Sequence, residues 1–103
     1  MAAESTLNEQ LLGAIAKRRR LKFRYNGLPR FGEPHVLGVS RGSVQLLFYQ
    51  TGGATSSGGL PQWRRFHVDR MSDLNVEDEI FPGGRQPPSG THAQWDEQWA
   101  FVP

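Results

Sequence analysis

The spacing of apolar residues changes at Leu21, and this change constrains the fold more than any other feature of the sequence. Before it, Leu7, Leu11 and Ile15 recur every four residues, which places their side chains on one face of a helix. From Leu21 to Tyr25 apolar and charged residues alternate, which is the spacing of a strand with one buried face. The sequence therefore predicts one N-terminal helix followed by β structure.

Local signals predict where the helix begins and where the chain turns. Thr6 followed by Glu9 fits a capping box, so we expect the helix to begin at Thr6. Asn26-Gly27 and Arg41-Gly42 are typical of tight turns between strands. Alternating or β-prone segments then predict five strands, at residues 21–25, 34–40, 43–50, 63–68 and 74–81.

One helix followed by short strands favours a small closed or partly open β-barrel, because closure removes exposed strand edges. The chain has 103 residues, the size of one domain with one modest core, which we expect over residues 1–81. Residues 51–59 are rich in glycine and serine and predict a flexible loop. Residues 82–103 are expected to form a Pro/Gly linker, at 82–90, and an aromatic tail.

The tail carries three large aromatic residues that are costly to leave in water. Thr91 and Gln94 fit a second capping pattern, and Trp95 and Trp99 would share one face of a helical turn. Phe101 follows closely. We therefore expect the tail to dock, either on its own barrel or on a second copy of the chain.

Several classes of protein are disfavoured by the composition. The chain has no cysteine, and His35, His67 and His92 share no metal-ligand spacing, so we expect neither a metal nor another cofactor. No nucleophile elbow, phosphate-binding loop or pair of carboxylates is present, so we expect no catalytic residues and no enzyme activity. Without a signal peptide or a long apolar stretch, a cytoplasmic protein with no membrane partner is expected.

The charges are distributed unevenly along the chain. Residues 1–70 contain eleven Lys or Arg against four acidic residues, a net charge of +7. Residues 71–103 contain one Arg against six acidic residues, a net charge of −5. The basic part predicts an anionic partner, which could be a nucleic acid, another polyanion or the acidic tail itself.

Three stretches together resemble the WYL domain, a bacterial regulatory module. They are "AIAKRRRLKFRY" at 14–25, "EPHVL" at 33–37 and "RRFHVDRM" at 64–71, and the resemblance covers about residues 11–81. The Trp-Tyr-Leu motif itself is degenerate. In "GSVQLLFY", Val44 and Gln45 stand where the motif has Trp and Tyr, and only Leu46 is kept. The resemblance implies an SH3-like or Sm-like barrel of about five strands after a helix. It also implies a sensor of nucleic acid or nucleotide-like ligands in transcriptional or defence-system regulation.

Part of the expected binding site follows from that resemblance. The arginines at the end of the family's last motif correspond to Arg64 and Arg70, and a guanidinium group suits phosphate because it can bind in a bidentate manner. Alternatively, Asp69 pairs with an arginine and only secures the strand end. Gln45, which replaces the motif tyrosine, could hydrogen-bond a ligand or be an ordinary polar strand residue.

The remaining candidates follow from the alternation within strands. Trp63, Arg65 and His67 share one face, on which an aromatic ring could stack a base while the cations hold its phosphate. Trp63 could equally cover an edge of the core. Lys22 and Arg24 lie on the polar face of the first strand, as a polyanion site or as a solvated surface. The expected ligand-binding set is Lys22, Arg24, Gln45, Trp63, Arg64, Arg65, His67 and Arg70.

Two functions from different classes remain open at the level of sequence. In the first, the barrel binds single-stranded nucleic acid or a nucleotide-like ligand through a basic face. In the second, it is a protein interaction or oligomerisation module with no nucleic-acid ligand, and a homodimer or a partner protein is held through Trp95, Trp99 and Phe101.

Overall fold

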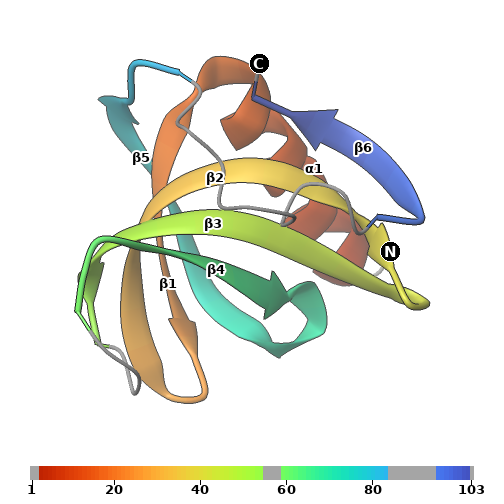
Figure 1. The fold of residues 1–103 in the computed structure, drawn as a ribbon, viewed down its shortest axis with the longest axis horizontal. Helices are drawn as coiled ribbons and strands as arrows, with labels where there is room; N and C mark the ends of the chain where they lie inside the picture. The colour runs from red at the N-terminus through yellow and green to blue at the C-terminus, as the bar shows by residue number, and fades with distance from the viewer. Residues whose placement is uncertain (1–2, 55–58, 84–94, 103) are drawn as a thin grey trace.

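The computed structural model describes residues 3–54, 59–83 and 95–102. It is mainly β, with one N-terminal helix, as the change of periodicity predicted (Figure 1). The elements are, in chain order, helix α1 (Ala3–Lys17), strands β1 (Arg19–Tyr25), β2 (Leu28–Ser40), β3 (Ser43–Gly53) and β4 (Gln62–His67), a 3₁₀ turn η1 (Val68–Arg70), and strands β5 (Met71–Ile80) and β6 (Glu97–Phe101).

The strands form one antiparallel sheet that bends into a small barrel-like shape with α1 against it (Figure 1). The order is β4-β3-β2-β1-β5, and β6 pairs with β2 outside this path. Strand β2 is the longest and pairs with β3 along one edge. Its other edge is shared, because residues 28–32 pair with β1 and residues 36–39 pair with β6.

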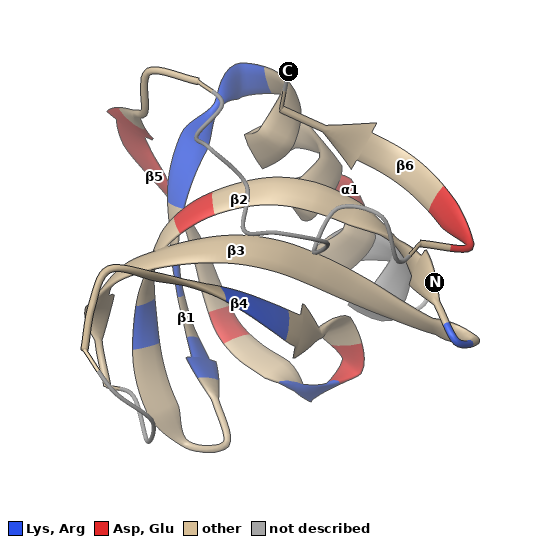
Figure 2. Ribbon diagram, in the orientation of Figure 1, with Lys and Arg blue, Asp and Glu red and all other residues tan. Residues whose placement is uncertain are grey.

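Basic and acidic residues are distributed unevenly over this sheet, although the acidic Glu33 lies on β2 together with Arg30 (Figure 2). Lys and Arg are spread over β1, β2, β4 and the two turns that flank them, whereas acidic residues gather on β5 and at the start of β6. The uneven charge distribution of the sequence is therefore also a spatial one, with β5 placed directly beside the basic strand β1.

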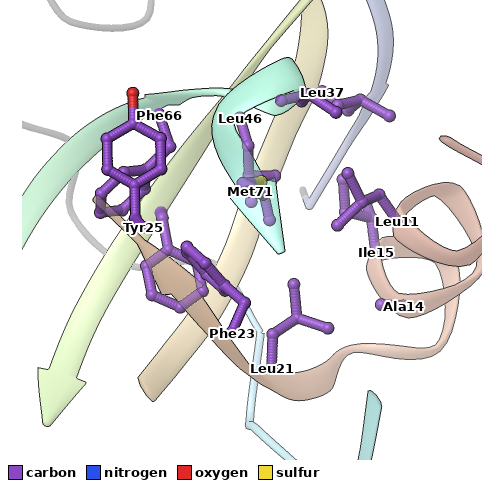
Figure 3. Close-up of a cluster of buried hydrophobic side chains, with 12 residues drawn as sticks. Leu11, Ala14, Ile15, Leu21, Phe23, Tyr25, Leu37, Leu46, Phe66 and Met71 are labelled. Atoms are coloured by element: carbon purple, nitrogen blue, oxygen red, sulfur yellow. The ribbon is translucent and has the colours of Figure 1, made fainter. Parts of the chain in front are cut away.

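The core forms where α1 crosses the sheet (Figure 3). Leu11 and Ile15 of the helix are buried in the same cluster as Phe23 of β1. The ring of Phe23 meets the rings of Phe48 and Phe66 edge to face, at centroid distances of 5.0 and 5.2 Å. Such aromatic pairs add to the stabilisation from burial alone, so the β1 alternation holds the barrel and the helix together.

Both predicted tight turns are confirmed. Asn26 and Gly27 have φ values of 54° and 76°, and Arg41 and Gly42 have values of 52° and 79°. Two successive residues with positive φ match the twist of antiparallel strands, and glycine adopts the second position without steric cost. The β1–β2 and β2–β3 hairpins thus form where the sequence places them.

Some boundaries differ from those predicted. The helix begins at Ala3, so the prediction that Thr6 caps it is wrong. Strand β2 begins at Leu28 rather than Pro34, since the β1–β2 ladder starts directly after the turn. Pro34 lies at an irregularity of the β2–β3 pairing, which is where a strand tolerates a residue without an N–H group.

The other strands are found where alternation predicted them, with shifted ends. Strand β1 begins at Arg19 rather than Leu21, and β5 begins at Met71 rather than Leu74. Strand β3 continues to Gly53, so the first residues of the expected loop at 51–59 belong to a strand. Residues 55–58 of that loop lie outside the described residues.

The tail forms a strand and not the helical turn that the spacing of Trp95 and Trp99 predicted. Residues 97–101 pair with β2 in the same chain. The physical reason is that the edge of β2 beyond β1 presents backbone N–H and C=O groups, which a strand satisfies and a helical turn does not. Thr91, Gln94 and most of the expected linker lie outside the described residues.

Within the described part of the chain, no helix has the length and apolar character needed to cross a membrane.

Candidate functional site

A cavity of about 360 Å³ opens where the β2–β3 turn meets strand β4. We call it the hairpin pocket. Among the described residues that line it, every side chain can form hydrogen bonds, two are arginines, and none is acidic. The lining residues are Ser40, Arg41, Ser43, Gln45, Arg65 and His67.

Strand pairing brings these residues together. Gln45 of β3 is the direct partner of His67 in β4, and Leu47 is the partner of Arg65. Because side chains two residues apart share a face of a strand, Gln45, Arg65 and His67 project to the same side of the sheet. The turn at Arg41 then closes one end of the pocket.

Gln45 organises the interior of the hairpin pocket. Its side chain is buried, and its amide Nε2 donates to the carbonyl oxygen of Ser40 at 3.1 Å and to Ser43 Oγ at 3.2 Å. Its Oε1 accepts a long hydrogen bond of 3.4 Å from Arg65 Nη1. On the other side, Ser43 Oγ lies 3.2 Å from His67 Nδ1. These contacts hold the turn, the serine and the guanidinium group in a defined arrangement.

The positive charge of Arg65 is held in an unfavourable environment. Burial lowers the pKa of Arg65, and the charge of Arg41 lowers it further. The indole ring of Trp95 partly offsets this, because the Arg65 Cζ atom lies 3.9 Å from its centroid in a cation–π contact. An anion bound beside Arg65 would favour the charged guanidinium and so raise this pKa again.

The tail fastens to the rim of the pocket through Asp96. Its Oδ2 accepts a hydrogen bond of 2.8 Å from the backbone N–H of Arg41. Its own N–H donates to the carbonyl oxygen of Val39 at 2.8 Å. The segment just before β6 is thus bonded to the same turn that lines the hairpin pocket.

Of the predicted site residues, Gln45, Arg65 and His67 meet in this pocket. Trp63 shares their face of β4, but its ring packs 4.8 Å from the ring of His35 and 5.0 Å from that of Tyr49. This packing agrees with the alternative interpretation that Trp63 covers an edge of the core.

The other predicted cations do not line this pocket. Arg64 lies on the opposite face of β4. There, burial lowers the pKa of Arg30, and the charge of Arg64 lowers it further. Lys22 lies 5.3 Å from the ring of Phe31 and lines a separate cavity. Arg24 is an exposed residue of β1. Alternation in the strands separates neighbouring cations, which a count of charges along the sequence does not show.

Arg70 is also outside the pocket, as an exposed residue of η1. In the part of the chain that the structure describes, it forms no ion pair with Asp69, so that pair does not secure the strand end. Asp69 instead lines a small cavity beside Asn8 of the helix.

Sequence reasoning missed Ser40, Arg41 and Ser43. Arg41 was interpreted only as a turn residue, and nothing in its neighbours indicates that it will face Arg65. The acidic tail was one of the partners left open for the basic part, but the stacking of Trp95 on Arg65 and the hydrogen bond from the Arg41 N–H to Asp96 were not predicted, because the tail was expected to be helical. The β3–β4 register and the path of β6 decide these contacts, and neither is visible in the sequence.

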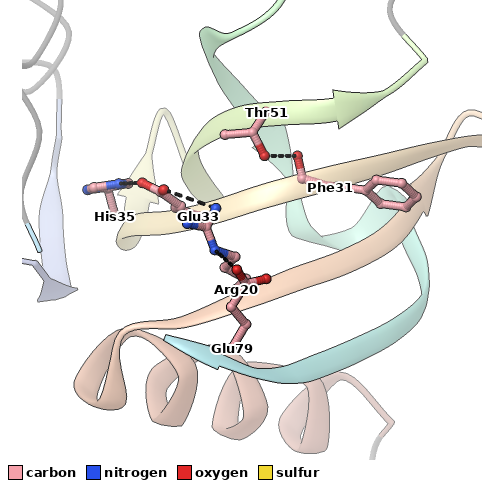
Figure 4. A network of polar contacts seen from close by, with 6 residues as sticks. All are labelled: Arg20, Phe31, Glu33, His35, Thr51 and Glu79. Atoms are coloured by element: carbon pink, nitrogen blue, oxygen red, sulfur yellow. Dashed lines mark hydrogen bonds and ion pairs between the residues drawn. The ribbon is translucent and has the colours of Figure 1, made fainter. Parts of the chain in front are cut away.

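The structure also contains a buried polar cluster, which we call the Glu33 network (Figure 4). The carboxylate of Glu33 is fully buried and lies 3.3 Å from Arg20 Nη1 and 3.1 Å from His35 Nε2. Arg20 also lies 3.5 Å from Glu79 of β5. The network therefore joins β1, β2 and β5 through charge-assisted contacts.

Neither metal binding nor a catalytic triad is supported by the described residues. Among them, no group of three or more His, Cys, Asp or Glu side chains could hold a metal ion. Ser43 and His67 are close enough to form a nucleophile–base pair, but in this part of the chain no carboxylate contacts the His67 ring to orient it. The arrangement is suited to binding.

No protein-family model matches the chain, and no curated protein or solved structure matches it either. The resemblance to the WYL domain therefore stays a hypothesis. The function is therefore inferred from the residues that line the hairpin pocket.

Proposed function

We propose that the protein is a ligand-sensing module whose hairpin pocket binds a phosphate-bearing, nucleotide-like anion. One observation carries the proposal: Arg41 and Arg65 line the same cavity, together with two serines, a glutamine and a histidine that can form hydrogen bonds. Guanidinium groups bind phosphate through charge-assisted hydrogen bonds, so two of them at one cavity suit a bound anion.

The size and chemistry of the pocket favour a compact ligand. Its volume of about 360 Å³ lies within the range of about 300 to 1,000 Å³ that is usual for small-molecule sites. Guanidinium groups can each hold a phosphate through two parallel hydrogen bonds, and Ser43 and His67 add further donors or acceptors. A nucleotide or the end of a single strand fits this description better than a long polyanion along the barrel.

Such a ligand agrees with the class that the WYL resemblance implies. Under this proposal the protein binds the anion without chemical change, and the binding regulates transcription or a defence system in the cytoplasm. The family assignment and the regulatory role are parts of the same proposal, and both depend on ligand binding.

The proposal is tested by isothermal titration calorimetry with ADP, AMP and adenosine at low salt. We expect affinity to decrease in that order, because each step removes a phosphate. Arg65→Gln should weaken ADP binding by at least about tenfold, roughly 1.4 kcal/mol. The matched control is Arg24→Gln, which removes an exposed charge outside the pocket and should bind like the wild type. Equal affinity for ADP and adenosine, or an Arg65→Gln variant that binds normally, would contradict the proposal.

A second candidate is a protein interaction module, favoured by the exposed aromatic residues of β6. Trp99 is 41% exposed and Phe101 is 58% exposed, although both belong to a paired strand. Size-exclusion chromatography with light scattering would detect self-association through them. This function gains support if the wild type forms a dimer that Phe101→Ser abolishes while no nucleotide binds.

A further inference from the structure

Two residues connect the hairpin pocket to strand β6. Trp95 stacks on Arg65, and Asp96 accepts a hydrogen bond from the backbone of Arg41. Both directly precede Glu97, the first residue of β6. The position of β6 therefore decides which groups of the tail stand at the rim of the pocket.

Docking of β6 depends on a close approach at Gly38. A Cβ atom at this position would lie 2.1 Å from the carbonyl oxygen of Glu97, and its three nearest neighbours all belong to the backbone of Glu97 and Gln98. Only a residue without a side chain allows the two backbones to come so close. A change at Gly38 therefore acts first on the contact with β6.

Strand β6 is a short edge strand. It spans five residues, whereas its partner β2 spans thirteen, and it pairs only with Val36–Val39. One backbone hydrogen bond flanks it on either side, from Asp96 to Val39 and from Val102 to His35, each 2.8 Å long. Short edge strands with exposed side chains open at lower free energy than the rest of a sheet.

We propose that β6 and the anion in the hairpin pocket oppose each other, so that ligand binding releases β6 and uncovers the edge of β2. The inference rests on the proposed function and adds the regulation of that site. Asp96 brings a carboxylate to the rim, and within the described residues no cation is ion-paired with it. A phosphate held by Arg41 and Arg65 is repelled by this carboxylate. A released edge at Val36–Val39 would then accept a strand from a partner, which gives the sensor an output.

The first test releases β6 without touching the lining of the pocket. Gly38→Ala should reduce protection from hydrogen exchange at residues 36–39 and 97–101, and should tighten ADP binding by at least about fivefold. Because coupling is reciprocal, ADP added to the wild type should reduce protection of residues 97–101. Gly13→Ala is the matched control, since nothing lies within 4 Å of a Cβ at that position, and it should leave exchange and affinity unchanged.

The second test removes only the charge and also serves if Gly38→Ala does not fold. Asp96→Asn keeps an oxygen that accepts from the Arg41 N–H, so β6 should stay docked while ADP binds more tightly. Asp73→Asn is its control, because it removes an exposed charge outside the pocket at a residue with φ 52°, which asparagine tolerates.

The possible results separate this inference from the proposed function. If ADP binds none of the variants, the proposed function fails and the coupling fails with it. If ADP binds the wild type and requires Arg65, but binds Asp96→Asn with the same affinity and leaves exchange of β6 unchanged, the coupling is overturned alone. Weaker ADP binding by Gly38→Ala with β6 released would show coupling of the opposite sign and would also overturn it.

Discussion

The Glu33 network and the hairpin pocket both contain arginine and histidine, but these residues have different roles in the two clusters. In the network, Arg20 and His35 converge on a fully buried carboxylate. In the pocket, Arg65 and His67 line an open cavity together with Arg41, Gln45 and two serines. The first cluster contains its own carboxylate, whereas no acidic residue is among the described residues that line the second.

The difference shows what decides whether a basic cluster is structural. Aromatic rings pack against the Glu33 network: the rings of Trp63 and Phe81 lie 4.8 and 5.2 Å from the ring of His35. The hairpin pocket is lined by hydrogen-bonding groups and has room for a ligand. An arginine that pairs with a buried carboxylate has a structural role, because loss of either partner leaves an uncompensated charge. Arginines that line an open cavity can instead bind an external anion.

The largest effect that would sharpen this comparison is expected from Glu33→Ala. It leaves Arg20 and His35 without their shared acceptor in a buried site, which should reduce the free energy of unfolding by about 3–5 kcal/mol. Urea unfolding followed by circular dichroism measures this. Glu79→Ala, which removes the exposed second partner of Arg20, is the control and should cost less than about 1 kcal/mol. If both variants lost the same free energy of unfolding, the buried position of Glu33 would not make its ion pair more important than the exposed one.

A smaller effect is expected when the arginine of each cluster is replaced, because Arg65 should matter for binding and Arg20 for stability. Arg65→Gln should weaken ADP binding by about tenfold and change the free energy of unfolding by less than about 1 kcal/mol. The stability should be nearly kept because burial and Arg41 both disfavour the charge of Arg65. Arg20→Gln should do the opposite, since Glu33 then loses a cation. Thermal unfolding and calorimetry on both variants test this, and a large loss of stability in Arg65→Gln would break the distinction.

The salt dependence of binding tests how many cations take part. For a short single-stranded DNA, each neutralised phosphate contributes a slope of about −0.7 in a plot of log affinity against log salt. Two arginines predict a slope of about −1.4, whereas four contacts on a broad basic face would give roughly −3. Fluorescence anisotropy over a salt series measures the slope, and Arg41→Gln should reduce its magnitude by about 0.7.

The smallest effect concerns the support of the pocket. Ser43→Ala removes the hydroxyl that contacts Gln45 and His67, which should lower stability by about 0.5–1.5 kcal/mol and weaken ADP binding only slightly. Thermal unfolding and calorimetry measure the two quantities. A loss of binding as large as that of Arg65→Gln would mean that Ser43 contacts the ligand directly.

The fold could be predicted from local signals to a large extent, and the candidate site only in part. The alternation at Leu21–Tyr25 and the two glycine turns act within a few residues, so they predicted β1 and both hairpins. The same reasoning placed Gln45, Arg65 and His67 among the candidates. It also included Lys22 and Arg70, because sequence shows the charge of a residue and not the direction of its side chain.

Periodicity, turn residues and charge are local properties, so one helix, a set of antiparallel strands and an excess of cations in the first seventy residues could be predicted from the sequence. Which cations meet depends on strand pairing. Arg41 and Arg65 line the same cavity because β3 pairs with β4 in a register that no nearby residue specifies. The tail became a strand because β2 extends beyond β1 and its backbone groups there need partners, a requirement that belongs to β2 and is absent from the tail's own sequence.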